Sequence, residues 1–238
     1  MAAAPVAGAI RGLYRQLLGA YGPQGWWPVP SQGGYHPGDY DTPRAPAARF
    51  EVIMGAVLTQ NTAWTNAAAA LESLRAARVR LPSALLGLSH ARLARLIRSS
   101  GYFNEKAKKL LVTAGFFSRR GALGRAAAPS REALLALWGI GPETADSILL
   151  YAFQEPVFVV DAYTRRVLDR IGLIEGQESY DEIQRIFHAA IRPNAPVYNE
   201  YHALIVEHAK RHCASRPRCE GCPVKRCRYR DGPPAGRP

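Results

Sequence analysis

Apolar residues recur at helical spacing along most of this chain, in windows separated by Gly, Pro or Asn. The alternating pattern that is typical of β-strands is almost absent. One window, residues 50–60, is apolar on nearly all sides, which is typical of a buried helix. The sequence therefore predicts an all-α fold of many short helices. The windows cover residues 6–20, 50–60, 65–77, 90–99, 104–119, 130–137, 143–153, 162–171, 180–191 and 196–212.

The chain is strongly basic. Lys and Arg number 31 against 19 Asp and Glu, which gives a formal net charge of +12. Basic soluble domains commonly bind nucleic acid, although simple solubility or the arginine bias of a GC-rich genome would give the same excess. No stretch approaches the ~20 apolar residues of a membrane helix, and the first residues do not resemble a signal peptide. We therefore expect a cytoplasmic protein.

All four cysteines lie close together near the C-terminus, at Cys213, Cys219, Cys222 and Cys227. In a reducing compartment, such a group indicates a metal site rather than disulfides. Four thiolates in so short a loop can enclose one tetrahedral ion or one cubane cluster. Zinc is the generic interpretation of this pattern.

A second motif lies at residues 137–146, where one helix is expected to end and the next to begin. The turn contains Gly139 and Gly141, and Pro142 follows at a position where a helix does not need its N–H. Glycines let a backbone approach a partner closely, and a helix N-terminus attracts anions. The motif is typical of a phosphate-binding hairpin, and an ordinary corner between helices is the alternative.

An aspartate follows this hairpin. Asp161 comes after the apolar run 157–160 and opens a helical window. With the hairpin, this pattern resembles the helix-hairpin-helix Gly/Pro-Asp superfamily of DNA glycosylases, which includes endonuclease III. The resemblance implies that Gly139 and Gly141 lie in a loop that grips the DNA backbone, and that Asp161 is the catalytic carboxylate. A helix cap is the other role that this aspartate could have, and the two roles are compatible.

Further segments match the same superfamily in the same order. Residues 58–62 match the segment whose glutamine, here Gln60, enters the base stack, with a buried helix-end glutamine as the alternative. Residues 101–107 match a turn whose lysine, here Lys106, is expected to contact DNA; a solvated helix face is the alternative. The resemblance also implies two lobes, one formed by residues 49–155 and the other by residues 1–48 and 156–238.

For the cysteines, the resemblance implies a [4Fe–4S] cluster. Endonuclease III carries its ligands with gaps of six, two and five residues, and the gaps here are five, two and four. Each outer gap is one residue shorter, so the loop is expected to be tighter. We favour the iron–sulfur cluster over zinc, with Cys213, Cys219, Cys222 and Cys227 as its ligands.

Glu143 stands where members of the superfamily with lyase activity carry a nucleophilic lysine. A carboxylate cannot form the Schiff base of that reaction, so a glycosylase without lyase activity is expected. Residues 24–28, which contain Trp26-Trp27-Pro28, residues 50–62 and the hairpin match the 3-methyladenine DNA glycosylase III branch, and within the superfamily this chain resembles that branch most. The resemblance implies that Trp26 or Trp27, together with Phe50, sandwiches the flipped base. Core packing is the alternative for these aromatic residues.

These features predict a base-excision-repair glycosylase that acts on alkylated purines. Its expected partner is double-stranded DNA containing damaged bases, and it is expected to be monomeric, nucleoid-associated and independent of membranes. Two alternatives stay open. One is an endonuclease III-like glycosylase of oxidised pyrimidines, with or without lyase activity at abasic sites. The other is a catalytically weak protein that binds damaged DNA.

Overall fold

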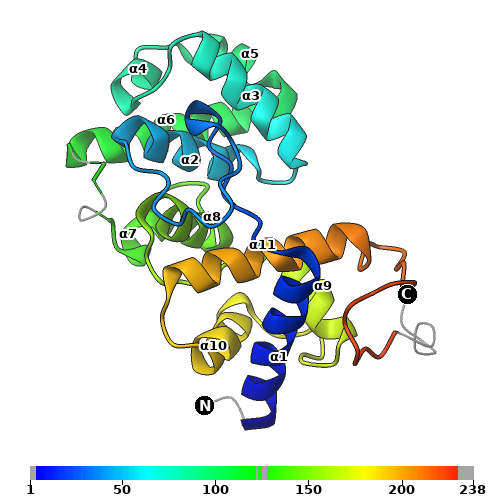
Figure 1. Cartoon of the computed structure of the whole chain (residues 1–238). Helices are drawn as coiled ribbons and strands as arrows, with labels where there is room; N and C mark the ends of the chain where they lie inside the picture. Colours follow the sequence, from blue (N-terminus) through cyan, green and yellow to red (C-terminus); the bar gives the residue numbers. More distant parts are fainter. Residues whose placement is uncertain (1–3, 122, 125–127, 230–238) are drawn as a thin grey trace. The chain divides into compact units, whose positions relative to one another are not determined.

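A computed structural model describes residues 4–121, 123–124 and 128–229, and it confirms the all-α prediction (Figure 1). The described ranges contain no β-strand and only an isolated bridge between Val29 and Gly34. None of their helices is long and apolar enough to cross a membrane. The α-helices are α1 (Ala4–Tyr21), α2 (Pro46–Leu58), α3 (Trp64–Ala76), α4 (Pro82–Leu86), α5 (His90–Leu96), α6 (Phe103–Arg120), α7 (Arg131–Leu135), α8 (Pro142–Ser147), α9 (Ala162–Arg170), α10 (Tyr180–Ala190) and α11 (Ala195–Arg211). Short 3₁₀ helices are η1 (Pro30–Gln32) and η2 (Arg98–Ser100), and the π-helical segment η4 (Ile148–Ala152) extends α8.

The chain divides into two compact units. The first comprises residues 1–26 and 156–238, in which α1 packs against α10 and α11, and α9 packs against α11. Its core contains a stacked pair, Phe158 and Phe187, whose ring centroids lie 3.6 Å apart. The buried Tyr201 hydroxyl donates a 2.8 Å hydrogen bond to the Ile10 carbonyl. Segments from both ends of the sequence therefore share one core.

The second unit comprises residues 27–155 and is built around α2. This helix contacts α3, α6, α8 and η4, and ten of its thirteen residues are buried. These neighbours cover most of the surface of α2, which explains its nearly all-round apolar window in the sequence. On one side Gly55 lies against Trp27: a Cβ at Gly55 would be 3.1 Å from Trp27 Cζ2.

The first boundary between the units differs from the expected one, because residues 27–48 belong to the second unit and not to the first. Trp27 packs against Trp64 and Tyr151, with ring centroids 5.2 and 5.1 Å away. Farther along, the Gln154 side chain donates a 2.8 Å hydrogen bond to the Tyr40 carbonyl. These contacts join sequence-distant residues, so periodicity alone could not assign the segment.

Candidate functional site

The hairpin has the backbone that its glycines predict. Gly139 adopts φ +81°, a left-handed conformation that favours glycine. Gly141 caps α8 in an extended conformation, and Pro142 occupies the first turn. Arg131 on α7 forms a bidentate ion pair with the fully buried Asp146 on α8. Its Nε and Nη2 donate to the two carboxylate oxygens at 2.8 and 3.2 Å. This pair fixes the two helices of the hairpin to each other.

Gln60 lies directly after α2 and is bound to the hairpin. Its Nε2 donates to the Gly139 carbonyl at 3.1 Å and to the Thr144 hydroxyl at 2.9 Å. Its Oε1 accepts a hydrogen bond from the Lys109 ammonium at 2.5 Å. The structure thus brings together Gln60 and Gly139, two of the residues that the sequence singled out.

Lys106 does not lie where a surface DNA contact requires it, and this corrects the sequence-based expectation. Its side chain is 2% exposed and its ammonium donates to the carbonyls of Leu58 and Ser100, at 2.8 and 2.6 Å. Burial, with a smaller effect from the neighbouring Lys109 charge, lowers the pKa of Lys106 to about 8. Lys106 therefore joins the end of α2 to the start of α6.

Two other lysines of α6 reach the hairpin, and the sequence did not identify them. The Lys109 side chain packs on Gly139, where a Cβ would lie 2.6 Å from Lys109 Cγ. The Lys108 ammonium lies 4.0 Å from the ring centroid of the partly exposed Trp138. These lysines lie about thirty positions before the hairpin, so sequence proximity could not reveal the contact. A single pocket is lined by Gln60, Asn61, Tyr102, Glu105, Lys106, Lys109, Trp138 and Gly139.

Asp161, in the first unit, is the N-cap of α9. Its Oδ1 accepts a 2.7 Å hydrogen bond from the Thr164 N–H, and its Oδ2 lies 3.5 Å from His202 Nε2 on α11. Burial alone would raise the pKa of Asp161. The His202 imidazole and the hydrogen bonds from His202 and Thr164 outweigh that effect, so the pKa lies below its ordinary value. The carboxylate is therefore held ionised, although its side chain is only 14% exposed.

The three aromatic residues that were expected to hold a flipped base differ in burial. Phe50 and Trp27 are 1% and 6% exposed and pack in the core of the second unit. Trp26 is partly exposed and ends the first segment of the other unit. Just before it, the Gln24 N–H donates a 2.7 Å hydrogen bond to the buried Glu200. Of the three, Trp26 has the most accessible surface, and Trp27 and Phe50 serve the core in this conformation.

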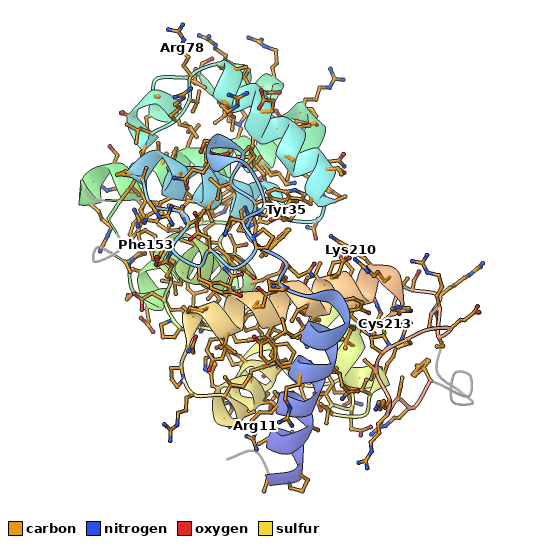
Figure 2. The ribbon with its side chains drawn as sticks, in the orientation of Figure 1. Arg11, Tyr35, Arg78, Phe153, Lys210 and Cys213 are labelled. Atoms are coloured by element: carbon orange, nitrogen blue, oxygen red, sulfur yellow. The ribbon has the colours of Figure 1, made fainter. Side chains whose placement is uncertain are left out.

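The cysteine loop follows α11 (Figure 2). Its four thiols line one pocket together with residues of α9 and α11. Two of the sulfurs accept hydrogen bonds: Cys213 from the Arg170 guanidinium at 3.3 Å, and Cys227 from the Tyr229 N–H at 3.4 Å. Donors of this kind stabilise thiolates that bind metal clusters.

The loop is held mainly by arginines of α9. Arg170 is buried and donates to the carbonyls of Ala214 and Ser215, at 2.6 and 2.8 Å, while Arg166 donates to the Cys213 carbonyl at 2.7 Å. The Arg170 guanidinium also lies 5.1 Å from the ring centroid of Tyr229. One helix thus carries Asp161 at its start and the support of the cysteine loop at its end.

The arrangement of the thiols bears on which metal group they could hold. In the described part of the chain, no three or more His, Cys, Asp or Glu side chains form a group placed to hold a metal ion. The thiols surround a shared pocket instead. Burial, followed by the nearby thiols, raises the pKa of Cys222 and Cys227, and a bound cation would oppose both effects.

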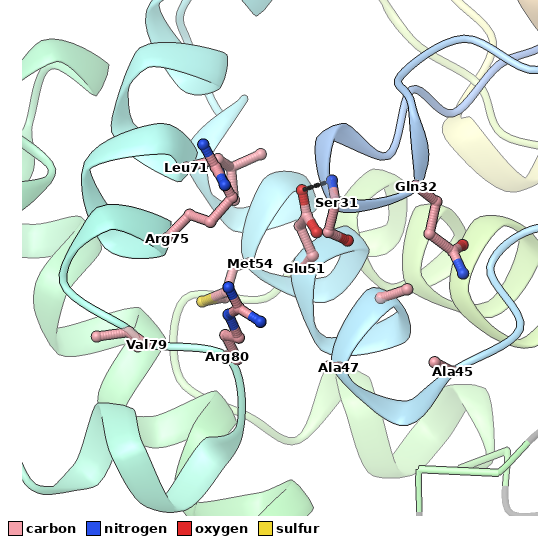
Figure 3. A pocket seen from close by; sticks show the side chains of 11 residues that line it. Ser31, Gln32, Ala45, Ala47, Glu51, Met54, Leu71, Arg75, Val79 and Arg80 are labelled. Carbon is pink, nitrogen blue, oxygen red and sulfur yellow. Dashed lines mark hydrogen bonds between the residues drawn. The ribbon is translucent and has the colours of Figure 1, made fainter.

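Another pocket lies between η1, α2 and α3 (Figure 3). Glu51 accepts a 3.2 Å hydrogen bond from the Ser31 N–H there, and Met54 and Leu71 contribute apolar surface. Arg75, on its wall, is paired with Glu72 on the same helix at 2.7 Å. This pocket shares no lining residue with the pocket beside the hairpin, so we do not include it in the candidate site.

Comparison with protein families identifies one match. Residues 54–193 match the model of the HhH-GPD superfamily of base excision DNA repair proteins. A relative from Methanocaldococcus jannaschii, assigned as a DNA repair glycosylase, is 39% identical over 90% of this chain and 92% of its own length. Endonuclease III of Haemophilus influenzae is 28% identical over 76% of this chain and 84% of its own.

Solved structures share the fold. The H. pylori 3-methyladenine DNA glycosylase bound to 1,N6-ethenoadenine is 30% identical, with a TM-score of 0.67 over 87% of this chain and 96% of that one. An endonuclease III–DNA complex gives a TM-score of 0.73 over 94% of this chain and 96% of that one. At 20% identity, the second match supports the fold alone.

Proposed function

Because this chain belongs to the HhH-GPD superfamily of base excision DNA repair proteins, we propose that it is a monofunctional glycosylase of alkylated purines in double-stranded DNA. The observation that carries the chemistry is Asp161, a carboxylate held ionised at the N-terminus of a helix. Loss of a purine leaves positive charge on the sugar, and a fixed negative charge stabilises that transition state. Asp161 also orients the attacking water.

The hairpin supplies the grip on DNA in this proposal. Gly139 and Gly141 leave the turn without side chains, and α8 begins at the exposed residues Pro142 and Glu143, at the positive end of its helix dipole. Backbone N–H groups of this turn bind phosphate without reading sequence. Gln60, held against the same turn, fills the space that the extruded nucleotide leaves.

Two observations support alkylated purines as the substrate class. The H. pylori relative, named for 3-methyladenine, is bound to an etheno-adenine. Trp26, the partly exposed aromatic residue, belongs to the same unit as Asp161. A base that carries positive charge stacks more strongly on an aromatic ring, and it leaves without strong acid catalysis. Trp26 is therefore the proposed stacking platform.

The cysteine loop is the proposed site of an iron–sulfur cluster. Four thiolates can hold such a cluster or a zinc ion, and the proposal is supported by the four thiols lining one shared pocket. Cys213, Cys219, Cys222 and Cys227 would hold the cluster, which when bound supplies structural order to the loop. Arg170 and the Tyr229 N–H would donate to its sulfur ligands.

A second candidate function has one observation in its favour. The Lys109 amine lies beside the hairpin although its position in the sequence is remote. An amine at that place could attack an abasic sugar, as a glycosylase with lyase activity requires. Glu143, exposed at the start of α8, favours the monofunctional alternative.

Product analysis separates the two candidates. We expect methylated duplex DNA to release 3-methyladenine or a related alkylpurine, and the abasic strand to stay intact until alkali is added. Borohydride should trap no protein–DNA adduct, because trapping requires an amine nucleophile. Preferred release of thymine glycol would contradict the substrate class, and trapping that disappears in Lys109→Met would assign the lyase reaction to Lys109.

A further inference from the structure

The hydrogen-bonding capacity of the Gln60 carboxamide is almost fully used within the second unit. Both Nε2 hydrogens are donated, to the Gly139 carbonyl and the Thr144 hydroxyl, and Oε1 accepts from Lys109. An ammonium can only donate and a carbonyl can only accept. The orientation of the carboxamide is therefore fixed by its neighbours, with its oxygen toward α6 and its nitrogen toward the hairpin.

Lys109 is itself well placed to set this orientation. Its stem packs on Gly139, and two nearby residues of α6, Lys106 one turn earlier and the adjacent Leu110, are 2% and 1% exposed. The ammonium is thus placed by the packed face of a helix rather than by a flexible loop. Lys108, the adjacent residue, carries the same charge, but its ammonium lies over the Trp138 ring.

We propose that Lys109 is a positioning residue for Gln60: it fixes the carboxamide of the residue that enters the base stack, a role distinct from attracting DNA by charge. This inference rests on the proposed role of Gln60 in base flipping. A glutamine side chain loses considerable rotamer freedom when it is ordered. Fixing it before DNA arrives removes that entropic cost from the flipping step.

The test uses the whole protein and a duplex that needs no excision. The duplex carries a tetrahydrofuran abasic analogue beside 2-aminopurine, whose fluorescence rises when the stack is opened. We compare wild type, Lys109→Met, Gln60→Ala, the double variant and Lys109→Arg at saturating protein. Lys108→Met is the matched control, because it removes an equal charge from the adjacent position.

If Lys109 acts through Gln60, Lys109→Met lowers the fluorescence amplitude to the level of Gln60→Ala. The double variant is then no worse than either single variant, Lys109→Arg restores part of the signal, and Lys108→Met keeps it. A wild-type amplitude in Lys109→Met, or effects of Lys109→Met and Gln60→Ala that add, would overturn the proposal.

A second measurement, by NMR, tests the contact between Lys109 and Gln60 in the protein without DNA. The side-chain amide resonances of Gln60 should shift in Lys109→Met and stay in place in Lys108→Met; unchanged resonances in Lys109→Met contradict the contact.

The positioning role of Lys109 and the proposed alkylpurine substrate can be refuted separately. Normal fluorescence responses without alkylpurine release would refute the proposed substrate and leave Lys109 in its role. A wild-type amplitude in Gln60→Ala would refute both the wedge and its positioning.

Discussion

Asp161 combines a structural and a chemical role at a single residue. One carboxylate oxygen caps α9 through the Thr164 N–H, and the other lies near His202. An N-cap aspartate stabilises a helix by about 1 kcal/mol, and the same helix dipole favours its charge. The cap therefore helps keep the carboxylate in the ionised form that the proposed reaction needs.

Replacing Asp161 by Asn separates these two roles. Asn is as good an N-cap as Asp, so the thermal unfolding midpoint should change little and DNA binding should persist. The negative charge opposite the forming cation is lost, and we expect single-turnover excision to fall about 10²–10³-fold. Excision at the wild-type rate would show that the catalytic group lies elsewhere.

Replacing His202 by Gln tests how the charge of Asp161 is maintained. Activity requires the ionised carboxylate, so it is lost as the pH falls through the pKa of Asp161, which lies below its ordinary value in the wild type. Without the His202 imidazole, the effect of burial is less opposed and that pKa rises. The acid limb of the excision rate should move to higher pH. A limb at the wild-type position would mean that Thr164 and the helix suffice.

At the scale of elements, α9 connects two regions of the first unit. It begins directly after its N-cap, Asp161, and ends at Arg170, whose guanidinium binds the cysteine loop through Cys213, Ala214 and Ser215. The carbonyl of Arg170 also accepts a 2.9 Å hydrogen bond from the Arg228 N–H. Order in the loop and order in the helix that carries Asp161 therefore support each other.

The proposed cluster in the cysteine loop predicts the metal and sulfide content of the protein. Protein purified without oxygen should contain about four irons and four sulfides per chain and absorb visible light. Replacing Cys222 by Ser should lower the iron content and the thermal unfolding midpoint, because a metal bound only by the folded state stabilises that state. A colourless protein with one zinc ion would instead support the tetrahedral alternative.

Most helices were predictable from the sequence because periodicity is local. The ten windows match described helices to within a few residues. For example, α3 and α11 begin at Trp64 and Ala195, one residue before the predicted windows 65–77 and 196–212. The five-residue α4 was not predicted, since so short a helix shows little periodicity, and the equally short α7 was found only within the longer window 130–137. Local patterns are read directly from neighbouring residues.

The site was only partly predictable, because its contacts join distant positions. Motifs identified Gln60, Gly139 and Asp161, and the structure gives each a defined set of partners. Lys106 was expected at the surface and is buried, whereas Lys109 reaches the hairpin. Both lie on α6, and which of two lysines faces inward depends on helix packing that no motif encodes.

For the whole molecule, the dominant quantity is its charge of +12. The chain belongs to a superfamily of base excision DNA repair proteins, and a protein that neutralises DNA phosphates releases condensed counterions. We expect the logarithm of the DNA affinity to fall linearly with the logarithm of the salt concentration, with a slope of roughly −0.9 per phosphate contacted. Titrations of an undamaged duplex at several salt concentrations measure this slope. A flat dependence would mean that the basic residues serve another purpose.

The burial of α2 also limits how far the backbone at Gln60 can move. Gln60 lies two residues beyond a helix in which ten of thirteen residues are buried, so its backbone cannot move far without disturbing the core of the second unit. Local opening of such an element costs nearly as much free energy as global unfolding. We therefore expect substitutions that alter the contact between Gln60 and DNA to act on the rotamer of its side chain and on its hydrogen-bond partners, and not on the backbone. The backbone at Gln60 is held in place by its packing, so the partners of its side chain, Gly139, Thr144 and Lys109, determine how the carboxamide is presented.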